Sequence, residues 1–146
     1  MHALEAHRAT WETYGIASYQ YTFDAQCFCD QGPVPARIIV RADTLHAVLN
    51  PETGDTLRAR GSNRPVWNER PMEYPTIDRL FDIIDGELSK VFYRRPDSIH
   101  VKYNEEYGYP AYIHIDQRVG RTGAVAGDDE LTLTVGDLEA SRYDPK

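Results

Sequence analysis

The sequence predicts an α+β fold, in which an antiparallel sheet of about six strands carries helices on one face. Three observations predict it. Most extended segments alternate hydrophobic and polar residues, two segments have the helical period, and joins of hairpin length connect several of the extended segments. Such short joins pair neighbouring strands antiparallel. The expected order is helix, three strands, helix and three strands, in one domain over residues 1–146 with a core from about 8 to 138 and a tail at 139–146.

The first helix is expected over residues 3–14, where hydrophobic and aromatic side chains recur at intervals of three and four before Gly15 ends the helix. The first strand follows at residues 16–29, with Tyr19, Tyr21 and Phe23 on one face. The chain has ten tyrosines and four phenylalanines. Because tyrosine suits half-buried strand surfaces, this ratio favours a sheet with one exposed face.

The second and third strands are expected at residues 36–41 and 44–49, joined tightly by Ala42 and Asp43. Residues 55–75 contain three prolines and show little periodicity. A connection of this length is expected to pack in part against the body or to form a functional loop.

The clearest helix is expected from Thr76 to Phe92, with Thr76 as N-cap and Asp78 where negative charge suits the helix dipole. Gly86 inside it costs about 1 kcal/mol relative to alanine, which favours a close backbone approach at that point. Its hydrophobic face consists of Ile77, Leu80, Phe81, Ile84, Leu88 and Val91. The last three strands are expected at residues 98–103, 111–116 and 131–140.

Composition excludes several classes of function. The net charge of −7 argues against a nucleic-acid partner, because phosphate binding needs a concentrated basic surface. Apolar runs stay far below the roughly 20 residues of a transmembrane helix. We also find no signal peptide, no nucleophile motif, no phosphate-binding loop and no Ser-His-Asp order, so neither catalytic residues nor a cofactor are predicted.

Several motifs occur together in a fixed order. They are Trp11 before Tyr19-x-Tyr21, Cys27-x-Cys29, Thr76–Ile84, Val101–Asp116 and Asp128–Glu130. The ordered set resembles a family of small bacterial domains of unknown function, common in exported proteins and lipoproteins. The resemblance implies a periplasmic or cell-envelope location and allows a lipid anchor upstream of residue 1, whereas the missing signal peptide is the argument for a cytoplasmic location.

Cys27 and Cys29 are the two cysteines of the chain. Residues two apart in a strand lie about 6.5–7 Å apart at Cα, the upper limit for a disulfide. A bridge therefore needs a bend, which the adjacent Gly32-Pro33 turn can support. A disulfide is the favoured interpretation, a reduced packed pair is the second, and a metal or redox role is the third.

His100 and His114 lie on the two arms of one predicted hairpin and are expected to be cross-strand neighbours on the polar face. Together with His46 they would form a three-histidine group that suits zinc or copper. Surface-facing alternation explains the same pattern without a metal and is preferred, so no metal ligand is predicted.

Trp67, Tyr107, Tyr109 and Tyr112 are the candidate partner-binding residues, as an exposed aromatic patch around a rigid turn. Packing of the turn tyrosines over the end of the hairpin is the equal alternative. The sequence thus predicts a non-catalytic cell-envelope domain that acts as a protein-interaction module or accessory subunit. The alternative is a periplasmic protein that binds a small ligand or metal on the face of His46, His100 and His114.

Overall fold

The structure is a computed structural model that describes residues 3–27, 33–59, 61, 63–69, 73–88, 99–116 and 130–140. Its elements in chain order are α1 (Ala3–Tyr14), β1 (Tyr19–Cys27), β2 (Ala36–Arg41), β3 (Thr44–Leu49), α2 (Val66–Glu69), α3 (Ile77–Leu88), β4 (Ile99–Tyr103), β5 (Pro110–Asp116) and β6 (Glu130–Ala140).

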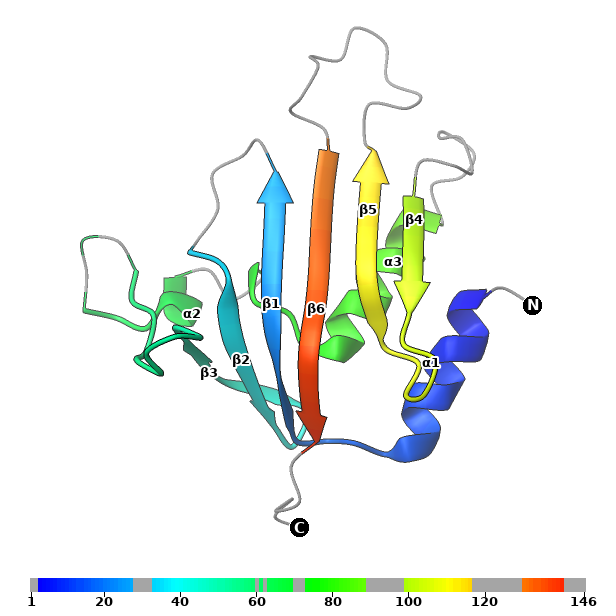
Figure 1. Ribbon diagram of the computed structural model, residues 1–146, viewed down its shortest axis with the longest axis horizontal. Coiled ribbons are helices and arrows are strands. Elements are labelled where there is room, and N and C mark those ends of the chain that lie inside the picture. The colour runs from blue at the N-terminus through cyan, green and yellow to red at the C-terminus, as the bar shows by residue number, and fades with distance from the viewer. Residues whose placement is uncertain are drawn as a thin grey trace, which may run out of the picture.

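The strands form a single six-stranded sheet in the order β3-β2-β1-β6-β5-β4, and every neighbouring pair is antiparallel. The first and last strands of the chain therefore form the central pair. Helices α1 and α3 lie on the same side of this sheet, behind it in the view of Figure 1. The predicted α+β class, with helices packed on one face, is confirmed.

The hydrophobic core lies between the sheet and the two longer helices. The helices contribute side chains at helical spacing, and each strand contributes every second residue, as amphipathic elements packed face to face require. The helical members are Leu4, Trp11, Ile77, Leu80, Phe81 and Ile84. The strand members are Tyr19, Tyr21, Phe23, Ala36, Ile38, Val40, Val48, Ile113, Ile115, Leu133 and Val135.

Tyrosine hydroxyls in this core bond to the backbone at the start of α3. The Tyr21 hydroxyl donates to the carbonyl of Pro75, and the Tyr19 hydroxyl accepts the N–H of Ile77 at 2.8 Å. A buried polar group is costly unless it is paired. The many tyrosines therefore serve the covered face as well as the exposed one, because their hydroxyls fix the entry of α3.

The long connection predicted after residue 55 lies against β3 where it is described. The Leu57 N–H donates to the carbonyl of Val48 at 3.0 Å, and the Val66 N–H donates to the carbonyl of Leu57 at 2.8 Å. Val66 is buried and starts the short helix α2, which the sequence pattern did not reveal. The expectation that part of this segment packs against the body is correct.

The close backbone approach expected at Gly86 is not found among the described residues. A Cβ at Gly86 would meet no described residue within 4 Å, whereas a Cβ at Gly108 would lie 2.3 Å from the carbonyl oxygen of His7. The turn between β4 and β5 therefore packs against α1. At the other end of the sheet, β6 (Glu130–Ala140) covers the strand expected at residues 131–140.

Candidate binding site

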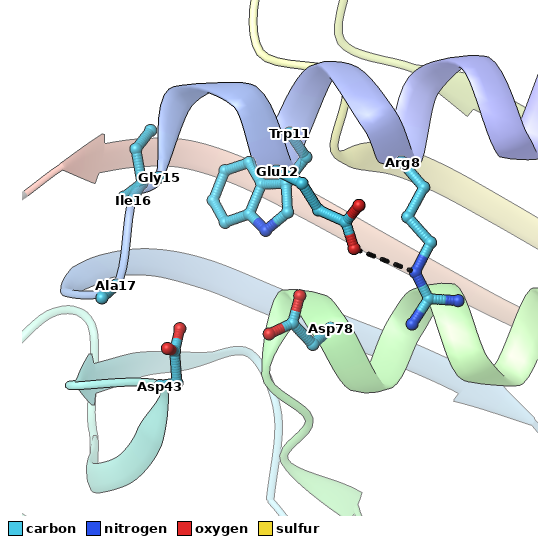
Figure 2. A pocket seen from close by; sticks show the side chains of 8 residues that line it. All are labelled: Arg8, Trp11, Glu12, Gly15, Ile16, Ala17, Asp43 and Asp78. Atoms are coloured by element: carbon cyan, nitrogen blue, oxygen red, sulfur yellow. Dashed lines mark ion pairs between the residues drawn. The ribbon is translucent and has the colours of Figure 1, made fainter.

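A hollow of about 390 Å³ lies between the end of α1, the turn from β2 to β3 and the start of α3. We call it the α1 hollow, and Figure 2 shows its side chains. It is lined by Arg8, Trp11, Glu12, Gly15, Ile16, Ala17, Asp43 and Asp78.

Trp11 is the aromatic wall of the α1 hollow. Its side chain is 3% exposed and makes edge contacts with Tyr19 and Tyr109, with ring centroids 5.4 and 6.1 Å apart. The indole N–H has no hydrogen-bond partner among the described residues, although every fully buried side-chain nitrogen and oxygen there is paired. The N–H is thus reachable from outside, and Figure 2 shows the indole nitrogen on the side of the ring that faces Asp43 and Asp78.

Three carboxylates and one guanidinium surround this wall. Glu12 comes from α1, Asp43 from the turn between β2 and β3, and Asp78 from the first turn of α3. Arg8 is engaged by Glu12 at 3.9 Å and by Asp82 at 2.9 Å. Among the described side chains that line the α1 hollow, carboxylates therefore outnumber cations, and their summed formal charge is negative.

Local structure holds the two aspartates in place. Asp43 has a φ of 62°, a left-handed conformation that Asp tolerates better than most residues, and its N–H donates to the carbonyl of Ala17 at 2.8 Å. Asp78 follows the predicted N-cap, which is confirmed because the Arg79 N–H donates to Thr76 Oγ1 at 3.2 Å. The charges of both aspartates also act on Tyr19 in the core. Burial, and next the charges of Asp78 and Asp43, raise the pKa of Tyr19 well above its ordinary value, against the lowering effect of the bond from Ile77.

The second candidate surface is the side of the sheet that no described helix covers, which we call the open face. Its side chains are held by neighbours across the strands. Lys102 Nζ lies 5.7 Å from the centre of the Tyr112 ring, and the rings of His100 and His114 stack with centroids 6.5 Å apart. His114 Nδ1 also forms a 2.9 Å hydrogen bond with Thr132 Oγ1.

Arg37 organises the other half of the open face. Its guanidinium donates to Gln20 Oε1 and Thr22 Oγ1 at 2.9 Å each, and to Glu139 Oε2 at 2.7 Å. A shallow hollow of about 500 Å³ lies beside this network, between β1, β6 and Pro51. Planar guanidinium donors fix several acceptors at once, so these side chains are ordered before any ligand arrives.

The histidines do not form the three-membered group that was the alternative interpretation of the sequence. His100 and His114 are paired across β4 and β5, as expected, but His46 lies on β3 at the opposite edge of the sheet. Within the described part of the chain, no three His, Cys, Asp or Glu side chains are close enough to hold a metal ion.

The four candidate aromatic residues are not brought together into one patch. Trp67 lies in α2 and packs against the core, and Tyr109 is 8% exposed and belongs to the core. Tyr107 is half-buried against Tyr14, whereas Tyr112 lies on the open face. Of the four, Tyr112 is the one that the open face presents.

The predicted disulfide falls outside what the structure describes. The backbone of Cys27 ends β1, and Cys29 lies outside the described residues. The bridge stays a prediction.

A model of a family of unknown function, DUF6174, matches residues 3–140, which include both longer helices and all six strands. The chain belongs to DUF6174. This agrees with the unknown-function family that the motifs suggested, while the bacterial and exported character of that resemblance stays a prediction. No curated protein and no solved structure matches this DUF6174 member. Over the described residues, no helix of the DUF6174 fold has the length and apolar character needed to cross a bilayer.

The sequence did not reveal the α1 hollow. Its residues come from α1, the β2–β3 turn and α3, which are far apart in the chain. Asp43 and Asp78 were noted as turn and helix-start residues, roles that each satisfies locally. Only the packing of α1 beside α3 brings them to Trp11.

Proposed function

We propose that this DUF6174 member is a non-catalytic domain of the cell envelope that binds a partner protein through the open face of its sheet. The observation that carries the proposal is the cross-strand order of that face. Lys102 on Tyr112, His100 on His114 and Arg37 on Glu139 are already fixed in one arrangement. Side chains ordered in advance lower the entropy cost of association.

The charges of the open face indicate the chemistry of the partner. Its described side chains include the basic residues Arg37 and Lys102 and the acidic residues Asp24 and Glu139, so both signs occur. The acidic excess lies instead on α1 and α3, which carry Glu5, Glu12, Asp78, Asp82, Asp85 and Glu87 against Arg8 and Arg79. Interfaces are depleted in net charge and enriched in tyrosine. We therefore infer a partner with a polar surface of low net charge, one of whose side chains enters the hollow beside Arg37.

The envelope location rests on the resemblance of the ordered motifs to exported proteins and lipoproteins. The location is tested by fractionation of the source cells with an antibody against the chain. Recovery in the cytoplasmic fraction alone would remove this part of the proposal.

The partner is tested with a photocrosslinking amino acid at Thr134, which is exposed in the middle of the open face, in living source cells. The same amino acid at Glu5, exposed on α1, is the control. We expect one protein to be captured from position 134 and not from position 5. Tyr112→Ala should reduce its capture about tenfold or more, as loss of an aromatic anchor does, whereas Tyr14→Ala should not.

Equal capture from both positions, or capture unchanged by Tyr112→Ala, would contradict a partner on the open face. Tyr14 is a suitable control because it is 49% exposed, and a change there removes the same ring from the helix layer.

A further inference from the structure

We propose that the α1 hollow binds a small organic molecule that carries a primary ammonium group and a neighbouring oxygen acceptor, as 2-aminoethanol and 2-amino sugars do. This site lies on the helix side of the molecule and is independent of the open face. A failure of one proposal therefore leaves the other standing.

The first step of the argument is the indole N–H of Trp11. A buried tryptophan N–H usually finds an acceptor. Here the ring is 3% exposed, the N–H has no partner among the described residues, and Figure 2 shows it directed into the hollow. Asp43 and Asp78 lie across the hollow from the indole nitrogen in Figure 2. A ligand oxygen that enters the hollow would accept this hydrogen bond.

The second step is the charge of the hollow. Glu12, Asp43 and Asp78 face it, and Arg8 is already bound to Glu12 and Asp82. The positive end of the α3 dipole also points here, and Asp78 offsets it. The described charges that line the hollow sum to a negative value, so the hollow favours a cation. An ammonium group has three N–H donors and forms charge-assisted hydrogen bonds with carboxylates.

The third step is the size of the ligand. The volume of about 390 Å³ is near the lower end for small-molecule pockets. One amino sugar or one ethanolamine head group is a ligand of suitable size.

The test uses the indole N–H signals of the intact protein in ¹⁵N-¹H NMR spectra. The chain has two tryptophans, so Trp67 is an internal control, and Trp67→Phe assigns the signals. Titration with ethanolamine should shift the Trp11 signal saturably, with a dissociation constant of about 1–10 mM, and leave the Trp67 signal in place. Glucosamine and O-phosphoethanolamine then distinguish the two kinds of ligand. Tighter binding of glucosamine identifies an amino sugar, and tighter binding of O-phosphoethanolamine identifies an ethanolamine head group.

Matched variants connect the shift to the carboxylates. Asp43→Asn and Asp78→Asn should each weaken binding about fivefold or more, because each removes a charge-assisted acceptor. Asparagine tolerates the left-handed backbone at position 43, so the variant keeps the turn. Asp55→Asn removes the same charge from an exposed turn outside the hollow and should change the affinity less than twofold.

Three results would overturn the proposal. The first is a Trp11 signal that does not move with any of the three amines. The second is an equal shift with ethylene glycol, which has the oxygens but no charge. The third is an affinity that Asp43→Asn and Asp78→Asn leave as high as Asp55→Asn does.

Discussion

The helix layer and the open face belong to one sheet but are stabilised by different interactions. Behind the sheet, α1 and α3 bury hydrophobic side chains, and the few polar groups there bond to the backbone, as Tyr19 does to Ile77. On the open face, polar side chains such as Arg37 bond to one another across strands. Burial stabilises the first strongly, while exposed polar pairs contribute little. The fold therefore depends on one face, and the other is available for recognition.

The difference between the faces is tested most severely by the same substitution on each. Ile84 on α3 is 0% exposed, and Ile39 lies on the open face of β2 and is half-buried. Ile84→Ala should lower the free energy of unfolding by about 2–5 kcal/mol, because it leaves a cavity. Ile39→Ala should cost about 1 kcal/mol or less. Urea denaturation measures both, and equal losses would show that the open face is covered.

Gly108 connects the two regions, because its turn between β4 and β5 touches α1. Gly108→Ala places a Cβ against the backbone of His7 at a φ of 87°, so we expect a loss of about 2–4 kcal/mol. Gly54→Ala is the matched control, since its φ of 79° is similar but its Cβ would meet no atom of the described part of the chain within 4 Å. The control should lose about 1–2 kcal/mol from the backbone alone. Thermal unfolding gives both values, and equal losses would mean that the turn does not need its contact with α1.

Alkaline pH should weaken the helix layer. Burial, followed by the neighbouring charge or tyrosine, raises the pKa of Tyr19 and of Tyr21 above the ordinary value of about 10. The unfolded chain therefore loses these protons first as the pH rises, and the folded state loses stability above about pH 10, by up to about 1.4 kcal/mol per pH unit for each tyrosine.

Urea denaturation at several pH values from 8 to 11 gives the free energy of unfolding and its slope with pH. Tyr19→Phe should make it shallower, although Tyr103 and Tyr109, whose pKa values burial also raises, keep part of it. An unchanged slope in Tyr19→Phe would show that this hydroxyl is solvated in the folded protein.

The smallest effect is expected on the open face itself. Arg37→Met removes three hydrogen bonds from a side chain that is 14% exposed and should cost about 1 kcal/mol. Arg41→Met, an exposed change on the same strand, should stay within about 0.5 kcal/mol. If both variants are equally stable, the network does not order the face, and the argument from cross-strand order fails.

Much of the fold could be predicted because its signals are local. The period of Leu80, Phe81 and Ile84 marks the buried side of α3, and the cap at Thr76 marks its start. The hairpin of β2 and β3 begins and ends where the alternation and the Ala42-Asp43 turn place it. The short helix α2 gave no such signal, since four residues are too few for a helical period to show.

The candidate sites could be predicted less well. The pairing of His100 with His114 followed from their places in one hairpin, whereas the place of His46 stayed open because the sequence does not give the order of strands in the sheet. For Tyr109 the sequence left an exposed patch and packing over the end of the hairpin as equal alternatives, and the structure buries it where the turn packs on α1. The close approach at Gly108 could not be distinguished from that expected at Gly86, since the partner backbone lies in a distant helix.

The sequence by itself determined which segments become helices and strands, which side of each is hydrophobic, and hence the α+β class. These properties depend on residues a few positions apart. Only the tertiary structure decided that β1 and β6 meet at the centre of the sheet and that Trp11 lies beside Asp43 and Asp78. Those contacts join residues from distant parts of the chain, and no local pattern carries the packing free energy that selects them.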